Sequence, residues 1–302
     1  MNFMKTMRQF FFLFILLALP IFAQETDDDV INVDSSIVVL NATITDQNGK
    51  PVAGLKQSQF KIFEDGKEQT FDFFGAEVTP FAAVILLDTS GSMEQRISLA
   101  RSAAITFLDG LRLEDNAAIY NFDSKVSLLQ DFSNSRDVLD RVFDLKANGM
   151  TVLNDAIFEA AETLSKRPEK RRAIIVLSDG ADTKSKYSSD KALKAAISSN
   201  ATIYTVDMSS IDMNGRERMQ NQSVLKNFAE KSGGRFIAAS GGIALREAFA
   251  EISSELGSQY TLTYSPTNTA KDGKWRVIEV RVSKPNLTIR TRKGYNAPKD
   301  KK

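Results

Sequence analysis

Short oxygen-bearing side chains follow an apolar run at alternate positions. The run ends at Leu87, and Asp88, Ser90 and Ser92 come directly after it. A continuous apolar run predicts a strand covered on both faces, and side chains at spacing two can converge where the chain turns from that strand into a helix. Carboxylate and hydroxyl oxygens suit the hard cations Mg²⁺, Mn²⁺ and Ca²⁺ rather than zinc or copper. The sequence therefore predicts a cation site at this turn.

Two further oxygen-bearing residues occur at comparable points of the chain. Asp179 follows a second apolar run, residues 173–177, and Thr151 lies two residues after Gly149 in a loop that precedes a helix. Ligands of open α/β sheets bind outside the carboxyl ends of the strands, where the strand order reverses. If the strands before Asp88 and Asp179 are neighbours, the two carboxylates face each other, and Thr151 could complete the ring of oxygen ligands around the cation.

Strand and helix patterns alternate through the middle of the chain. Such alternation predicts right-handed crossovers and a mainly parallel, doubly wound α/β sheet with helices on both faces. One pair of strands, joined by a short turn at 123–124, is expected to form an antiparallel edge hairpin. The expected strands are 81–87, 117–122, 126–129, 173–177, 202–206 and 236–238, and the expected helices are 93–108, 137–145, 155–164, 190–197, 224–229 and 245–256.

The segments on either side of this α/β region show β patterns. Few strands are expected in each, and a small sheet is marginal without a packing partner. We therefore expect the α/β domain to be inserted between flanking β segments that pair into one β-sandwich; the rival is two separate sheets. Trp275 is expected to be buried there. The expected strands are 36–44, 60–63, 71–74, 259–264, 275–282 and 287–290.

The N-terminus has the pattern of a secretory signal peptide. Lys5 and Arg8 precede an apolar run from Phe10 to Leu19, and Ala23 offers a small residue for cleavage. A membrane anchor is the alternative, but the 14 residues from Phe10 to Ala23 are fewer than the roughly 20 that a spanning helix needs. We expect export to the periplasm, the cell surface or the medium. The expected divisions are 1–23 signal peptide, 24–35 flexible leader, 36–78 N-terminal β segment, 79–257 α/β domain, 258–296 C-terminal β segment and 297–302 basic tail.

Composition excludes several classes of chemistry. The chain of 302 residues has no histidine and no cysteine, which removes His-based triads, thiol nucleophiles, disulfides and the usual zinc sites. Its formal net charge of +1 gives no bias toward nucleic acid.

The ordered set of oxygen ligands resembles the metal-ion-dependent adhesion site of von Willebrand factor A domains, over roughly residues 81–256. That resemblance implies a six-stranded sheet. It also implies that Asp88, Ser90 and Ser92 are metal ligands, that Thr151 binds the ion directly or through water, and that Asp179 acts mainly through water. The flanks, at 44–66 and 272–295, resemble a bacterial exported subgroup of these proteins. One departure is Met150, which stands where the family often has glycine.

Charge counting suggests what such a site does. Two carboxylates, one of them acting through water, leave a divalent ion electron-poor, so an Asp or Glu of a protein partner is its natural further ligand. The sequence therefore predicts a non-enzymatic binding protein for adhesion or complex assembly, with Mg²⁺ favoured over Mn²⁺ or Ca²⁺ and no catalytic residues. A metal-dependent hydrolase or phosphatase, and a scaffold whose site holds no metal, remain as alternatives. Asp182 is interpreted as a solvated loop carboxylate.

Overall fold

The computed structural model describes residues 37–300, apart from 77–78, 136–139, 211 and 240. The predicted signal peptide and leader lie outside the described residues. Within the described part of the chain, no helix is long and apolar enough to cross a membrane.

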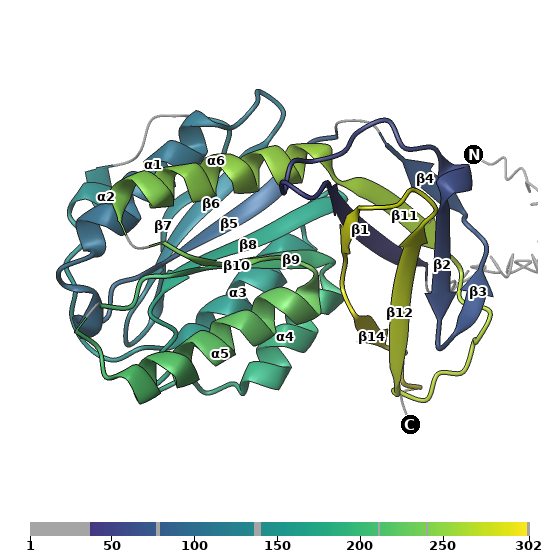
Figure 1. Ribbon diagram of the computed structural model, residues 1–302. Coiled ribbons are helices and arrows are strands. Elements are labelled where there is room, and N and C mark those ends of the chain that lie inside the picture. Colours follow the sequence, from purple (N-terminus) through teal and green to yellow (C-terminus); the bar gives the residue numbers. More distant parts are fainter. Residues whose placement is uncertain (1–36, 77–78, 136–139, 211, 240, 301–302) are drawn as a thin grey trace, which may run out of the picture. The chain divides into compact units, whose positions relative to one another are not determined.

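A six-stranded sheet occupies the middle of the chain (Figure 1). Neighbouring strands run parallel except at one edge, where β6 and β7 pair antiparallel as the hairpin pattern predicted. Every residue of β5 is buried, as expected for a strand covered on both faces. The predicted doubly wound, mainly parallel sheet is confirmed. Its order is β10 (Phe236–Ala238), β9 (Ala201–Asp207), β8 (Arg171–Ser178), β5 (Phe81–Asp88), β6 (Asn116–Phe122), β7 (Val126–Ser133).

Helices cover both faces of this sheet (Figure 1). On one face, α1 and α6 pack on alternate side chains of β5 and β8, and on the other face α3, α4 and α5 pack on the intervening ones. The longest of these helices was predicted only at 224–229, because the polar surface of its N-terminal part hides its helical period. The helices are α1 (Ile97–Asp109), α2 (Asp140–Phe143), α3 (Leu153–Ser165), α4 (Ser189–Ser198), α5 (Gly215–Ser232) and α6 (Gly242–Ser258).

Strands from before and after the α/β region pair with each other. Leu40 of β1 lies opposite Leu262 of β11, and Ile62 of β2 lies opposite Val280 of β12. The two four-stranded sheets share one apolar core, so the flanks form a β-sandwich and the rival of two separate sheets is wrong. Their orders are β13 (Thr288–Arg290), β1 (Val38–Thr45), β11 (Tyr260–Tyr264), β4 (Phe73–Gly75), and β14 (Gly294–Asn296), β12 (Trp275–Val282), β2 (Phe60–Glu64), β3 (Lys67–Gln69).

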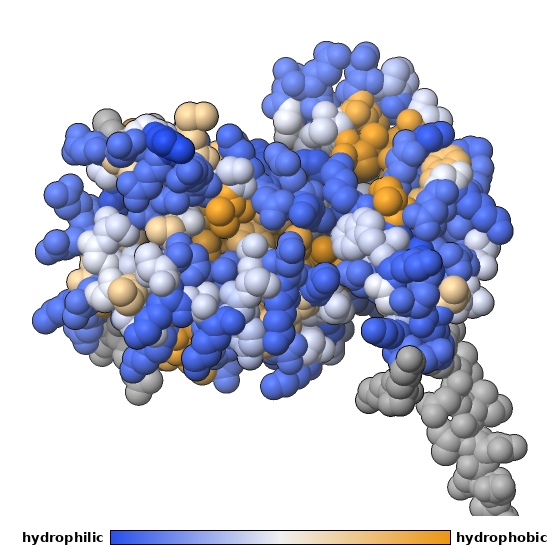
Figure 2. Space-filling model, turned by 90° about the horizontal axis from the view of Figure 1, so that it is seen from below, coloured by the Kyte–Doolittle hydropathy of each residue, from blue (hydrophilic) through white to orange (hydrophobic). Residues whose placement is uncertain are grey.

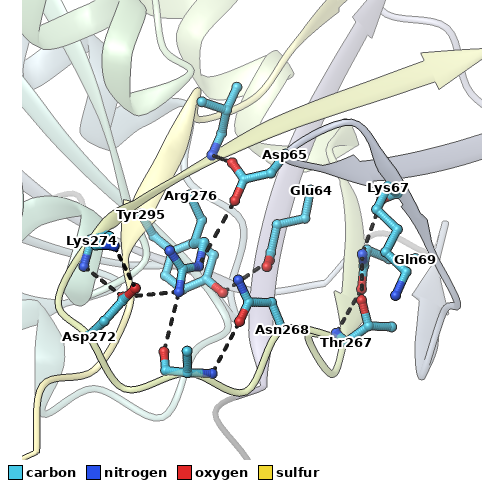
Figure 3. Close-up of polar contacts among 12 residues, drawn as sticks. Glu64, Asp65, Lys67, Gln69, Thr267, Asn268, Asp272, Lys274, Arg276 and Tyr295 are labelled. Atoms are coloured by element: carbon cyan, nitrogen blue, oxygen red, sulfur yellow. Dashed lines mark hydrogen bonds and ion pairs between the residues drawn. The ribbon is translucent and has the colours of Figure 1, made fainter.

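Strand β12 alternates cleanly between a buried and an exposed face. Arg276 lies on the buried face, where its Nη2 donates to Asp272 Oδ1 at 3.0 Å and its Nε lies 4.0 Å from Asp65 Oδ2 (Figure 3). The neighbouring Trp275 is 39% exposed, so the expectation that it is buried is wrong. Pairing of Val280 with Ile62 fixes the register, and period two then turns Trp275 outward.

Figure 2 shows a largely hydrophilic face with apolar residues gathered in a few patches.

A buried arginine joins the sandwich to the α/β region at the amino end of β8. Arg171 is 0% exposed, and it donates to the carbonyl oxygens of Gly257 and Gln259 and to Thr261 Oγ1. These acceptors run from the last turn of α6 into the start of β11, so Arg171 holds the point where the chain passes from one part to the other.

A glycine turn forms a second joint. Gly233 ends α5 with φ +88°, and a Cβ at this position would lie 2.4 Å from the backbone carbon of Thr291. The helix end and the sandwich therefore meet backbone to backbone, which only glycine allows here.

Candidate metal centre

Asp88 ends β5 at the carboxyl edge of the central sheet. It is 0% exposed, its Oδ1 accepts from Ser90 N at 2.9 Å, and its Oδ2 accepts from Ser178 Oγ at 2.5 Å. Burial is the largest cause that raises the pKa of this carboxyl, and the charge of Asp179 adds to the rise. Hydrogen bonds from Ser178 and Ser90 oppose it, and the resulting pKa is about 6. Both oxygens accept hydrogen bonds, and neither pairs with a cationic side chain in the part of the chain that the structure describes.

Ser90 and Ser92 follow Asp88 where the strand ends and a short 3-10 turn begins. Their hydroxyl oxygens lie 3.1 Å apart. Ser90 is 2% exposed, whereas Ser92 is exposed to solvent. The turn thus arranges oxygens from a buried end at Asp88 to an open end at Ser92.

Asp179 follows β8, which pairs directly with β5. It is 2% exposed, and its Oδ1 accepts from Ala181 N at 3.0 Å. Its charge acts on the Asp88 carboxyl, so the two buried carboxylates lie near each other at this edge. The neighbouring strands that the sequence argument required are therefore present.

The loop that carries Thr151 contacts both of these turns. Asn148 N donates to Thr89 O at 2.8 Å, and Gly91 N donates to Gly149 O at 3.2 Å. On its other side, Thr151 O accepts from the backbone N–H groups of residues 183 and 184, each at 3.0 Å. Thr151 itself is 3% exposed.

Met150 does not obstruct this loop. Its side chain is 52% exposed, and its backbone N donates to Ser124 Oγ at 3.1 Å. The preceding Gly149 takes the positive φ of +78° that the turn needs, so a methionine is accommodated where the family often has glycine.

Sequence reasoning missed residues that support this site. Ser178 donates the shortest hydrogen bond to Asp88, a contact that no sequence pattern predicted. Asp182 is more than a solvated loop carboxylate, and that interpretation is wrong. Its Oδ2 accepts from Asn154 N at 2.9 Å at the start of α3, and its Oδ1 accepts from Ser185 N at 3.1 Å. Asp182 thereby ties the loop after β8 to the helix after Thr151, a long-range contact with no local sequence signal.

The donor set fits a hard cation. Among the described residues, neither Asp88 nor Asp179 has an ion pair, and no group of three or more His, Cys, Asp or Glu side chains could hold a metal. A cation here would therefore depend on two carboxylates together with hydroxyls and water. Such all-oxygen, water-rich ligation is what Mg²⁺ takes in proteins.

Residues 83–181 match the family model described as von Willebrand factor type A domain. The chain therefore contains a von Willebrand factor type A domain, and the six-stranded sheet is its fold. No curated protein is significantly similar to the chain.

Several solved structures are similar to the chain. The pilus adhesin SpaC of Lactobacillus rhamnosus GG, in an open conformation, has a TM-score of 0.50 at 10% identity, covering 82% of this chain and 49% of SpaC. BatB of Bacteroides thetaiotaomicron, a conserved hypothetical protein, has a TM-score of 0.49 at 19% identity, covering 58% of this chain and 98% of BatB. The domain of the type V pili tip protein Mfa5 of Porphyromonas gingivalis has a TM-score of 0.49 at 15% identity, covering 59% and 95%. At these identities the likeness concerns the fold alone.

Proposed function

We propose that this chain is an exported, non-enzymatic binding protein that uses a divalent cation to engage an acidic residue of a protein partner. Asp88, Ser90 and Ser92 would bind the ion, with Thr151 and Asp179 completing its surroundings directly or through water. The preferred ion is Mg²⁺, and the role is adhesion or complex assembly.

One observation carries this proposal. Asp88 and Asp179 are both almost completely buried, side by side, and neither has a cationic partner among the described residues. Burying carboxylates without a counter-charge is costly, and the raised pKa of Asp88 reflects that cost. A bound divalent cation would offset it.

The open end of the cluster suggests how a partner would bind. Ser92 is exposed next to the buried Ser90, so a cation held here would be reached from solvent on the Ser92 side. Hydroxyl ligands add no charge, which leaves the ion with net positive charge for a partner carboxylate. Replacing a water by that carboxylate in a partly dry site is the kind of contact that anchors an interface.

The proposal of export rests on the N-terminal pattern alone. The similar pilus proteins are compatible with a surface location, but their low identity does not transfer a location or a partner.

Metal binding is tested by thermal unfolding during Mg²⁺ titration of the chelator-treated protein. A ligand that binds only the folded state stabilises it by about 2.7 kcal/mol at 100 times its dissociation constant. We expect this shift in the wild type and its loss in Asp88→Ala. Asp190→Ala, which removes an exposed carboxylate in the first turn of α4, is the matched control and should keep the shift. An equal shift in Asp88→Ala and wild type would count against the site.

Partner binding is tested separately. Capture of proteins from the native extract should depend on Mg²⁺, be lost with chelator, and be lost with Ser92→Ala. Turnover of a phosphoester that requires Asp88 would instead support the hydrolase alternative. Capture that chelator does not change would support the scaffold.

A further inference from the structure

A small pocket lies beside the candidate metal centre at the carboxyl edge of the central sheet. Its volume is about 210 Å³, which suits a single side-chain group rather than a nucleotide or sugar. Two arginines from different helices contribute to it. It is lined by Arg96, Asp207, Ser209, Arg218, Gln222, Ala238 and Ala239.

Strand pairing and a hydrogen bond connect this pocket to the candidate metal centre. Asp207 ends β9 in register with Ser178, the residue that donates to Asp88. Ser209 Oγ lies 3.4 Å from the carbonyl oxygen of Asp179. On the other side, Arg96 is the N-cap residue of α1, four residues after Ser92. The pocket and the cluster are thus neighbours on one surface.

The acidic residue of the pocket is already engaged within the chain. Asp207 Oδ1 accepts from Ser209 N at 2.9 Å and from Ser209 Oγ at 2.5 Å, and its Oδ2 accepts from Gln222 Nε2 at 2.7 Å. Asp207 therefore holds two wall residues in place instead of pairing with an arginine.

The two arginines have donors to spare. Among the described residues, neither Arg96 nor Arg218 has an ion pair or a side-chain hydrogen bond, and the buried Nε of Arg218 lacks any partner. A guanidinium presents five donors in a planar fork that matches a carboxylate. A carboxylate entering the pocket would meet these unused donors, and Asp207 would keep its own partners.

We propose that this pocket binds a second carboxylate of the same partner, so that the protein recognises an acidic pair and not one acid. The inference rests on the proposed function, because the first acid would be held by the cation. It narrows the partner to a protein segment with two acidic side chains, one reaching the Ser92 side of the cluster and one reaching Arg96 and Arg218.

Synthetic glycine-serine peptides provide the probe. One set carries a single aspartate, and the other carries two aspartates separated by one to five residues. Binding is measured by isothermal titration in Mg²⁺ at fixed ionic strength, because contacts between charges weaken with salt. At the best spacing, the two-aspartate peptide should bind at least ten-fold more tightly than the single-aspartate peptide.

Three variants test whether the pocket arginines cause the tighter binding of the two-aspartate peptide. Arg218→Gln and Arg96→Gln should each reduce the ten-fold ratio toward one and leave binding of the single-aspartate peptide unchanged. Arg216→Gln removes the same charge from the exposed surface of the same helix and should preserve the ratio. Circular dichroism confirms that each variant is folded. A separate readout comes from ¹⁵N-arginine labelling, in which the Nε signal of Arg218 should shift with the two-aspartate peptide only.

The outcomes separate this inference from the proposed function. If chelator leaves binding of the single-aspartate peptide unchanged, the metal proposal fails, whatever the ratio. A ratio near one at every spacing, failure of every two-aspartate peptide to bind, or an undiminished ratio in both Arg96→Gln and Arg218→Gln overturns the inference about the pocket.

Discussion

The two edges of the central sheet bury charge in opposite ways. At the amino edge of β8, Arg171 is fully buried, and its donors are used by carbonyl and hydroxyl oxygens of the segment that enters the sandwich. At the carboxyl edges of β5 and β8, Asp88 and Asp179 are also buried, but within the described ranges they have hydrogen-bond donors and no ion-pair partner. The amino edge is complete within the chain, whereas the carboxyl edge lacks a counter-charge among the described residues.

The difference separates a structural use of buried charge at Arg171 from the metal-binding use that we propose for Asp88 and Asp179. Burial lowers the pKa of Arg171 to about 10, so this residue stays protonated at neutral pH, and its bonds to the chain stabilise the joint with the sandwich. The pKa of Asp88 rises to about 6, because the hydrogen bonds from Ser178 and Ser90 offset its burial only in part. A group that is costly and incomplete in the isolated chain indicates that something from outside completes it.

The largest expected effect is a loss of stability when Arg171, at the amino edge, is replaced. Arg171→Met removes every donor from a buried site and leaves the carbonyl oxygens of Leu256, Gly257 and Gln259 without their partner. Each unsatisfied buried acceptor costs about 1–3 kcal/mol, so we expect a loss of about 3 kcal/mol or more in the free energy of unfolding. Urea unfolding measures it. Arg281→Met, at an exposed arginine of β12, is the control and should change stability little. A loss below about 1 kcal/mol would show that water replaces these bonds.

The second prediction concerns Asp88 at the carboxyl edge and the change of folding stability with pH. In chelator, the pKa of Asp88 is about 6 in the folded protein, against 3.8 for an ordinary aspartate. Between these values the unfolded chain has lost the proton that the folded chain keeps, so stability falls as pH rises. The shift corresponds to about 3 kcal/mol, present as a cost at pH 7 and absent at pH 3.

The Asp88→Asn variant isolates this contribution, because Asn does not titrate. Relative to wild type, it should gain about 3 kcal/mol of unfolding free energy between pH 3 and pH 7 in chelator. Saturating Mg²⁺ should remove most of this difference by stabilising only the wild type. A difference that stays flat with pH would mean that Asp88 is ionised at no cost, and the contrast between the edges would then disappear.

The smallest expected effect is on Mg²⁺ affinity, and it tests whether the loop that carries Thr151 contributes a ligand. Thr151→Val keeps the shape of the side chain and removes its hydroxyl. If this hydroxyl contacts the ion or a bound water, Mg²⁺ affinity should fall roughly ten-fold, equivalent to about 1.4 kcal/mol, with little change in the metal-free protein. Calorimetric titration with Mg²⁺ measures the affinity. An unchanged dissociation constant would remove Thr151 from the ligand set and leave the carboxylates and serines.

Much of the α/β region could be predicted because its signals are local. The apolar run before Asp88 predicted a strand buried on both faces, which the structure has. The spacing of Asp88, Ser90 and Ser92 predicted a turn that brings oxygen side chains together, and the two serine hydroxyls lie 3.1 Å apart. The strands β3 and β14, by contrast, were not predicted. Each has three residues, too few for a period-two pattern to stand out, and they form only because a longer strand lies beside them.

By itself, the sequence predicted which residues could bind a cation, and it determined the alternation that builds the sheet, because both depend on residue type and on spacing along a few residues. The tertiary structure alone decided that Asp182 ties α3 to the loop after β8, that Trp275 turns outward while Arg276 turns inward, and that Arg96 and Arg218 meet at one pocket. These arrangements bring together residues far apart in the chain, or follow from strand register. Burial and counter-charge are properties of such assembled neighbourhoods, and no local pattern encodes them.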